Sequence, residues 1–157
     1  MRCGGNIVHK LRRIDQVKNF GGILVHGCFD VVHYGHMRMF RTARQLMPHA
    51  PLTVSITADE FIMKGKGRPI FDQYFRAEFL CGIEFIDYVV VVDAPDALPV
   101  IRMVQPRYYV KGKEYEFAAG IAYEEKQLAE QLGATMVYTE RWFSTTDVVR
   151  KLNEVAG

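Results

Sequence analysis

The chain lacks the features of a membrane protein and of a protein from an oxidising compartment. No segment of its 157 residues contains the roughly 18 consecutive apolar residues of a membrane-spanning helix, and its N-terminus has no apolar signal region. It contains only three cysteines, an odd number without the spacing of a metal site. We therefore expect a cytoplasmic protein in a reducing environment that makes no contact with a membrane.

Strong charge is also missing, because the formal net charge is only +2 and the basic residues are scattered. This charge argues against a general nucleic-acid binder. The Gly-x-Gly-x-x-Gly fingerprint of dinucleotide-binding domains is absent as well, which argues against a redox or NAD-binding domain. Of the residues, 49% are hydrophobic and 24% charged. This composition is typical of a globular protein, and the length suits one domain with a real core.

Strand and helix patterns alternate along the chain. Five strands are predicted, over residues 23–25, 52–56, 87–92, 108–110 and 135–138. Five helices are predicted between and after them, over residues 34–47, 71–84, 96–104, 121–132 and 144–155. This alternation indicates an α/β fold, a single domain built on a Rossmann-like, doubly wound parallel sheet of about five strands. Residues 1–21 are expected to form a lead-in with a short helix over 15–19, and residues 22–157 the domain itself.

Helical spacing of apolar residues predicts which helix faces are buried. In the helix over 34–47 the expected buried stripe is Met37, Phe40, Ala43, Leu46 and Met47. In the helix over 71–84 the residues expected to point inward are Phe75, Phe79, Leu80 and Ile83. Phe71, Tyr74 and Phe75 suit a subunit interface as well as they suit a core.

A glycine turn and a histidine pair follow the first predicted long strand. Gly27-Cys28-Phe29-Asp30 leads directly into His33-Tyr34-Gly35-His36. Histidines three residues apart face the same way at the start of a helix, and the glycine between them allows a close approach to the backbone. A strand, a glycine turn and a helix start together predict a site that binds phosphate and stabilises charge developing on it.

A histidine pair is also half of many metal sites. Such a site needs at least one further ligand at a suitable spacing, and nothing groups His9, His26 or His49 with the pair. The phosphate interpretation is therefore favoured.

Further polar residues fall at the carboxyl ends of predicted strands, where ligands bind in sheets of this kind. Asp30 and Asp59 can hold turns or contact a substrate or Mg²⁺. Lys64-Gly65-Lys66-Gly67-Arg68 is either a solvated charge run or a mobile lid over phosphates. Lys111-Gly112 ends a strand, and Ser144-Thr145-Thr146 caps the last helix, where N–H groups also bind anions.

Together these residues resemble the nucleotidyltransferase superfamily with the histidine–x–glycine–histidine signature. Gly27 to His36 resembles its first motif and Ser144-Thr145-Thr146 its last. Within the superfamily the chain is most similar to the adenylyltransferase domain of ADP-heptose synthesis. That similarity rests on Gly27-Cys28-Phe29-Asp30, Lys66-Gly67-Arg68-Pro69 and Val110-Lys111-Gly112-Lys113-Glu114-Tyr115.

The resemblance implies transfer of a nucleoside monophosphate, AMP from ATP, to a sugar 1-phosphate such as heptose 1-phosphate, with release of pyrophosphate. It implies Mg²⁺ as cofactor, held mainly by the nucleotide phosphates, and a homodimer. The residues with an expected catalytic role are His33, His36, Lys66 and Arg141. Those expected to bind nucleotide are Gly27, Cys28, Phe29, Gly35, His36, Lys64, Lys111, Gly112, Ser144, Thr145 and Thr146. Asp30, Asp59 and Lys111 are expected to bind the acceptor substrate.

The chain departs from the ADP-heptose pattern at three places. His26 stands where asparagine is common, Lys113 replaces a glycine, and Arg141-Trp142-Phe143 precedes the Ser-Thr-Thr. An arginine before that motif resembles glycerol-3-phosphate cytidylyltransferases. The alternatives are therefore a CTP-dependent enzyme acting on glycerol 3-phosphate or a related alcohol phosphate or phosphonate, an FAD synthase, or a nucleotide-binding regulatory module without turnover.

Overall fold

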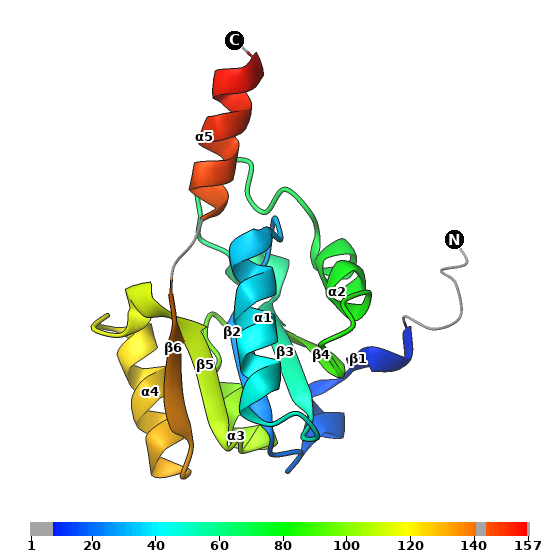
Figure 1. The fold of residues 1–157 in the computed structure, drawn as a ribbon, viewed down its shortest axis with the longest axis vertical. Coiled ribbons are helices and arrows are strands. Elements are labelled where there is room, and N and C mark those ends of the chain that lie inside the picture. The colour runs from blue at the N-terminus through cyan, green and yellow to red at the C-terminus, as the bar shows by residue number, and fades with distance from the viewer. Residues whose placement is uncertain (1–7, 141–143, 157) are drawn as a thin grey trace.

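One parallel sheet runs through the centre of the protein in a computed structural model, which describes residues 8–140 and 144–156. The strands lie in the order β1-β4-β3-β2-β5-β6, and every pairing is parallel (Figure 1). Their bounds are β1 Leu11–Arg12, β2 Ile23–Gly27, β3 Leu52–Thr57, β4 Tyr88–Val92, β5 Tyr108–Gly112 and β6 Thr135–Thr139. The predicted Rossmann-like fold is confirmed, and so are its five long strands.

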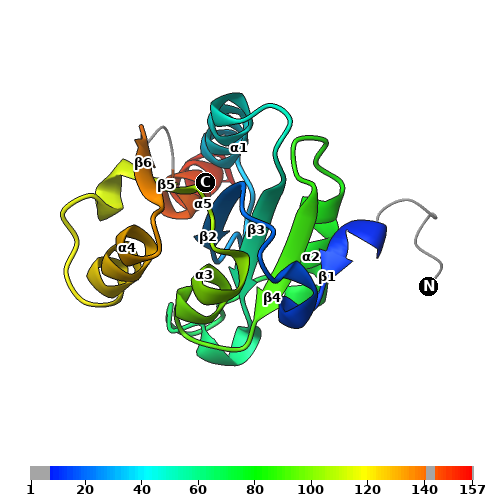
Figure 2. The ribbon, with the colours of Figure 1, turned by 90° about the horizontal axis from the view of Figure 1, so that it is seen from below.

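Helices cover both faces of the sheet (Figure 2). Alternate residues of a strand point to opposite faces, so Ile23 and Val25 of β2 belong to one core and Leu24 to the other. The first core contains residues of α1 and α2, and the second contains residues of α3 and α4. The helices are α1 Tyr34–Leu46, α2 Gln73–Cys81, α3 Leu98–Val104, α4 Ile121–Gln131 and α5 Thr145–Ala156.

The segment expected as a lead-in is packed against the rest of the fold. Leu11 and Arg12 form β1, which pairs with β4 at the edge of the sheet. Val17, in the short 3₁₀ helix Ile14–Val17, is completely buried in the second core. A strand of two residues has no detectable period of its own, so the sequence pattern did not reveal this sixth strand.

The buried face of α2 differs from the prediction. Leu80 and Ile83 are buried as expected, but Phe75 and Phe79 are 56% and 59% exposed. The buried positions include Arg76, Ala77 and Cys81 instead. In α1 the expected stripe is confirmed, with Phe40 and Ala43 buried and Met37, Leu46 and Met47 packed against the first core.

Arg76 can be buried because acceptors surround its guanidinium. It donates to the carbonyl oxygens of Cys28, Thr57 and Phe71 at 2.7, 2.9 and 3.1 Å, and to a carboxylate oxygen of Asp59 at 2.6 Å. A buried charge is tolerated when it is paired and hydrogen-bonded in this way. Arg76 thereby ties α2 to the carboxyl ends of β2 and β3.

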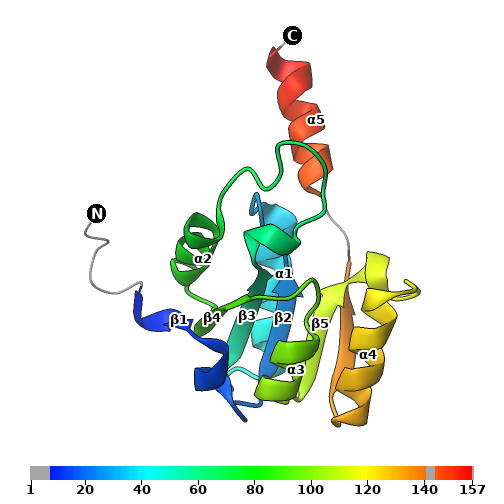
Figure 3. The same cartoon turned by 180° about the vertical axis from the view of Figure 1, so that it is seen from behind.

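The carboxyl ends of the strands form the edge of the sheet from which α1 and α5 begin. Helix α5 extends away from this edge beyond the rest of the molecule, and α3 and α4 cover the opposite face from α1 (Figure 3). In the ranges 8–140 and 144–156, no helix is both long and apolar enough to cross a membrane.

Candidate active site

The segment from Gly27 to His36, called here the glycine turn, links β2 to α1. Phe29 has a left-handed backbone with φ of +49° and is 5% exposed. A side chain is strained in that conformation, so its packing must hold it there. The Phe29 ring lies edge-on to His36 with centroids 5.0 Å apart, and a Cβ at Gly27 would lie only 3.1 Å from it. A side chain at Gly27 would therefore press on the ring that supports His36.

The two histidines of the turn are stacked, with ring centroids 3.8 Å apart and planes inclined by 26°. His33 is the N-cap of α1, and its Nδ1 accepts a hydrogen bond from the Gly35 N–H at 3.2 Å. The Nδ1 of His36 accepts from the His33 N–H at 3.3 Å. Because Nδ1 is the acceptor in both neutral rings, each ring carries its proton on Nε2. Both Nε2–H groups are then donors for a ligand.

Burial keeps these rings uncharged near neutral pH. Burial, together with the neighbouring His33 and Lys64, lowers the pKa of His36 to about 3. It also lowers the pKa of His33, although the carboxylate of Asp147 near the start of α5 acts in the opposite direction. The pair therefore presents neutral, directional hydrogen-bond donors.

Residues 63–69, called here the lysine loop, follow β3. Gly65 and Gly67 have φ of +93° and +80°, conformations that favour glycine. Lys64 and Lys66 are exposed on the loop. Arg68 lies against the glycine turn, with its Nε 2.7 Å from a carboxylate oxygen of Asp30. The loop thus combines exposed cations with one attached end.

Asp30 makes that attachment. Its side chain is 1% exposed and accepts hydrogen bonds from the Ile70 and Phe71 N–H groups, the shortest at 2.8 Å, besides its ion pair with Arg68. Burial raises the pKa of Asp30, but the N–H groups and the guanidinium lower it more, so the net shift is downward. Asp59 pairs with Arg76 and accepts from the Gln73 N–H at 3.1 Å. Both predicted substrate carboxylates hold loop ends here, and their role toward substrate stays a prediction.

Two pockets open at this edge of the sheet. The first, the histidine pocket, has a volume of about 120 Å³ and includes His33, His36, Gly112, Glu114 and Glu140 in its lining. The second, the alanine pocket, has a volume of about 500 Å³ and includes Phe61, Pro95, Ala118, Ala119 and Ala122. Both are lined by His26, Gly27, Cys28, Lys64, Lys111 and Tyr115, so these residues mark the junction of the two pockets.

Lys111, at the end of β5, is 8% exposed and lies in that junction. Its ammonium is 2.5 Å from a carboxylate oxygen of the buried Glu125. Next to it, the His26 ring lies between the hydroxyls of Ser55 and Thr57, with its Nδ1 2.9 Å from one and its Nε2 3.3 Å from the other. Burial, with the Lys111 charge, lowers the pKa of His26 to about 4. The floor of the junction therefore holds a paired lysine and a neutral histidine.

The last predicted motif lies at the start of α5. The Ser144 hydroxyl donates to Asp147 at 2.6 Å, and the Asp147 N–H donates back to it at 3.1 Å, so Ser144 caps the helix. Thr146 is exposed in the first turn. Arg141 lies outside the described residues, as does the side chain of Thr145. Asp147, in the first turn of this helix, acts on the histidine pair by raising the pKa of His33.

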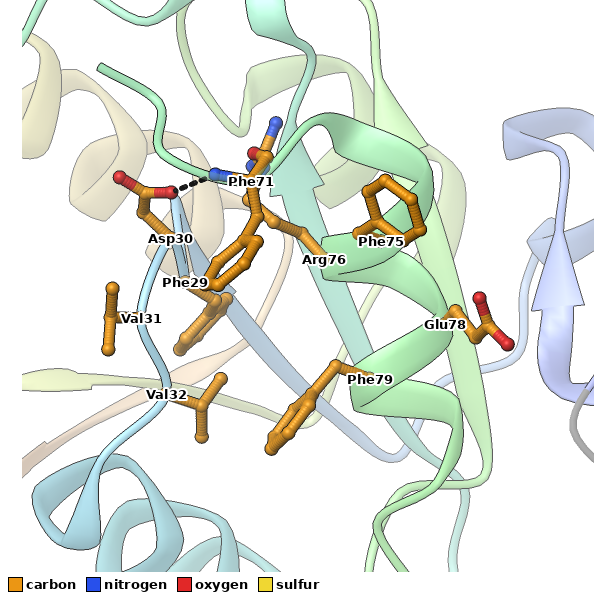
Figure 4. A pocket seen from close by; sticks show the side chains of 9 residues that line it. All are labelled: Phe29, Asp30, Val31, Val32, Phe71, Phe75, Arg76, Glu78 and Phe79. Atoms are coloured by element: carbon orange, nitrogen blue, oxygen red, sulfur yellow. Dashed lines mark hydrogen bonds between the residues drawn. The ribbon is translucent and has the colours of Figure 1, made fainter. Parts of the chain in front are cut away.

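A third pocket, the aromatic pocket, lies beside the glycine turn rather than over it. Figure 4 shows Val31 and Val32 of the turn facing the rings of Phe71, Phe75 and Phe79 across a hollow of about 530 Å³. Its lining is largely apolar, which suits a protein surface better than a phosphate. The aromatic pocket shares Phe29 and Asp30 with the histidine pocket but contains neither histidine of the pair.

A divalent cation fits the histidine pocket only when it is bound to a nucleotide as well as to the protein. Among residues 8–140 and 144–156, no group of three histidine, cysteine or acidic side chains could hold a metal. Glu114 and Glu140 nevertheless supply carboxylate oxygens to the pocket lining, and hard cations such as Mg²⁺ prefer oxygen ligands. These residues suit an ion that arrives with nucleotide phosphates.

Comparison with known proteins agrees with this geometry. Residues 24–151 match the cytidylyltransferase-like family, so the chain belongs to that family and is a nucleotidyltransferase. The chain is 34% identical over 122 residues to the bifunctional protein HldE of Campylobacter concisus, a match that covers 72% of the chain. It is 33% identical over 128 residues to the bifunctional protein HldE of Nitrobacter hamburgensis, which covers 80% of the chain. The resemblance to the adenylyltransferase domain of ADP-heptose synthesis is confirmed by these matches.

The chain spans about a quarter of these curated relatives, 25% and 26% of their lengths. Among solved structures it resembles a lipopolysaccharide core biosynthesis protein from Thermoplasma volcanium, with a TM-score of 0.58 and 21% identity over 78% of this chain and 96% of that one. It also resembles pantothenate synthetase from Thermus thermophilus, with a TM-score of 0.51 and 13% identity over 92% and 63%. These two likenesses show the fold alone.

Two buried charged residues of the site were not predicted from the sequence. Arg76 and Glu125 both lie on helix faces that are otherwise apolar, and a search for apolar periodicity passes over a charge in such a place. The signal that could have identified them is a single charged residue four positions from a buried apolar residue of the same helix, as Glu125 is from Ala129. Such a residue needs a buried partner.

Proposed function

We propose that the protein transfers AMP from ATP to a sugar 1-phosphate such as heptose 1-phosphate and releases pyrophosphate. The observation that carries the proposal is the stacked, neutral histidine pair with both Nε2–H groups available, in the lining of the histidine pocket, which shares six residues with the alanine pocket. The histidine pocket is assigned to the nucleotide and the alanine pocket to the body of the acceptor. The two phosphates then meet at the junction.

The reaction needs little from the protein beyond positioning and charge. An oxygen of the acceptor phosphate attacks the α-phosphorus, a new P–O bond forms, and the bond to pyrophosphate breaks in line. The acceptor phosphate is already an anion, so no strong general base is required. His33 and His36 donate hydrogen bonds to phosphate oxygens as negative charge builds up on them.

The cations of the site have separate tasks. Lys64, Lys66 and Arg141 neutralise the β- and γ-phosphates and the leaving pyrophosphate, and Lys111 contacts the phosphates at the junction. The N–H groups at the start of α5, with Ser144 and Thr146, bind a further phosphate oxygen. Mg²⁺ bound to the nucleotide would supply additional charge neutralisation, with Glu114 and Glu140 as the nearby carboxylates.

We place this reaction in the cytoplasm. The free thiols of Cys28 and Cys81 agree with a reducing compartment.

The proposal is tested by measuring pyrophosphate release with Mg²⁺, using ATP and CTP each against heptose 1-phosphate, glycerol 3-phosphate and FMN. Release with ATP and heptose 1-phosphate is the expected result. Release with CTP and glycerol 3-phosphate would instead establish a cytidylyltransferase. ATP with FMN would establish an FAD synthase, and silence with every pair would reject the proposal.

We also propose that two copies associate through the exposed face of α2. Tyr74, Phe75 and Phe79 of α2 and Phe71 just before it are 48–73% exposed, and the three phenylalanines line the aromatic pocket. An exposed apolar patch of this kind marks a protein interface more often than an isolated apolar residue does. Light scattering after gel filtration should give the mass of a dimer for the wild type and of a monomer for Phe75→Glu. A monomeric wild type would reject the dimer.

A further inference from the structure

We propose that Glu125 is a positioning residue that fixes the Lys111 ammonium at the junction of the two pockets. The inference rests on the proposed function, because it gives the junction lysine its task in phosphoryl transfer. Neither residue type nor spacing pointed to Glu125, which lies in α4, two elements further along the chain than the strand that carries Lys111.

The contacts of Glu125 hold its carboxylate in a single orientation. One oxygen accepts the Ala97 N–H at 2.9 Å. The other accepts the Tyr109 hydroxyl at 2.9 Å and the Lys111 ammonium at 2.5 Å. Glu125 is 2% exposed and Tyr109 completely buried, so water does not compete for these bonds. A carboxylate held by the residue that caps α3 and by two residues of β5 is a rigid point of attachment.

The charge balance explains why the pair persists. Burial alone raises the pKa of Glu125, but the Lys111 ammonium and the hydrogen bonds lower it more, and the net shift is downward. Removing one member of a buried ion pair leaves the other charge without compensation, which is costly. Glu125 therefore supplies the buried counter-charge for the Lys111 ammonium and also fixes its position.

The remaining neighbours of Lys111 leave it able to bind phosphate. Its ammonium lies 4.8 Å from the centre of the Tyr115 ring and 5.5 Å from that of Tyr109. An ammonium has three N–H donors. With one bound to Glu125, the other two can reach a phosphate oxygen from each pocket. Fixing the lysine in this way places a single charge between the attacking phosphate and the phosphorus under attack.

The first experiment replaces Glu125 with glutamine, which keeps the size and the acceptor for Ala97 but removes the charge. In steady-state kinetics of pyrophosphate release, we expect kcat to fall about 10- to 100-fold, as a reacting group displaced by about 1 Å would cause. KM for the nucleotide should change less than about threefold. Glu124→Gln is the matched control, since Glu124 is the preceding residue of the same helix and is exposed.

The second measurement does not need turnover. The protons of an ammonium buried in an ion pair exchange slowly with water, so Lys111 should give a ¹H–¹⁵Nζ NMR signal, assigned by its loss in Lys111→Arg. We expect the signal to vanish in Glu125→Gln and to persist in Glu124→Gln. Tyr109→Phe removes a hydrogen bond to the same carboxylate but keeps the ion pair. It should lower thermal stability, keep the signal, and reduce kcat less than Glu125→Gln does.

The outcomes separate the inference from the proposed function. If the wild type releases no pyrophosphate with any acceptor, the proposed function is rejected, whatever the result of the NMR measurement. If the wild type is active, two results reject the inference. The first is a Glu125→Gln variant that melts at a lower temperature but keeps the kcat of the wild type. The second is a Lys111 NMR signal that persists in Glu125→Gln. Equal losses of kcat in Glu125→Gln and Tyr109→Phe would also reject it, because they would indicate a structural role only.

Discussion

The glycine turn and the lysine loop both present donors at the same edge of the sheet, yet they are built in opposite ways. In the turn, the donors are neutral imidazoles whose Nδ1 atoms accept hydrogen bonds from backbone N–H groups. The His36 ring packs on Phe29, and the His33 ring stacks on His36. In the loop, the donors are full charges on exposed Lys64 and Lys66, with Gly65 between them and one attachment through Asp30.

The contrast follows from the cost of burying charge. A neutral ring can be buried and held in place, whereas an ammonium must stay in water or be given a counter-charge. The turn therefore supplies direction and the loop supplies charge. Lys111 follows the same rule, because its ammonium is buried beside the counter-charge of Glu125.

The sharpest test of the turn is His36→Ala. It removes one oriented donor while leaving Phe29 and the strand in place, and we expect kcat for pyrophosphate release to fall about 10²- to 10³-fold. The circular dichroism spectrum should be unchanged. His49→Ala, at an exposed histidine, is the control. A kcat near that of the wild type would remove His36 from the mechanism.

The next test uses acid, because neutral buried histidines should make the fold acid-sensitive. The unfolded chain binds a proton at His26 near pH 6.5, whereas the folded chain does so only near pH 4. Stability contributed by neutral His26 is thus complete above pH 6.5 and is lost as the pH falls toward 4, by about 3 kcal/mol in all. Urea unfolding between pH 7 and pH 4 measures this.

A variant identifies the source of that acid sensitivity. In His26→Asn the stability should depend less on pH over this range, and in His49→Asn it should depend on pH as in the wild type. If His26→Asn loses as much stability as the wild type between pH 7 and pH 4, the sensitivity has another origin.

The loop should respond more weakly, and unequally along its length. Lys64 lines both pockets, so Lys64→Ala should lower kcat/KM about tenfold or more. Lys66→Ala should lower it less, with an effect that fades as ionic strength rises, as expected for an exposed charge. Kinetics at two salt concentrations compare the variants. Equal, salt-independent losses would contradict this division within the loop.

The smallest expected effect comes from loosening the attachment of the loop. Asp30→Asn removes the ion pair with Arg68 but keeps an acceptor for the Ile70 and Phe71 N–H groups. We expect KM for the nucleotide to rise about three- to tenfold with little change in kcat. Trypsin should cleave after Lys64 and Lys66 faster than in the wild type or in the exposed-site control Asp93→Asn. Unchanged cleavage would mean that other contacts hold the loop.

The framework of the fold could be predicted because local patterns carry it. Strands such as 87–92 are apolar on both faces, as central parallel strands are, and the stripe of α1 has helical spacing. The turn between β2 and α1 was predictable for the same reason, since its glycines and histidines are contiguous in the chain.

The parts that escaped prediction depend on partners distant in sequence. Phe75 and Phe79 have helical spacing, but Arg76 is buried instead because acceptors from the glycine turn, from β3 and the residues after it, and from the segment before α2 surround its guanidinium. Glu125 is likewise explained only by Ala97, Tyr109 and Lys111. A pattern read along one segment contains no information about such partners.

The two-residue strand β1 has a consequence for anyone who shortens this protein. Its pairing with β4 occupies hydrogen-bonding groups that would otherwise lie open at the edge of the sheet. A chain that started at Ile23 would keep every residue of the two ligand pockets, yet it would expose that edge and the cavity left by Val17. Open edges of this kind template aggregation. The segment least related to chemistry thus protects the solubility of the enzyme.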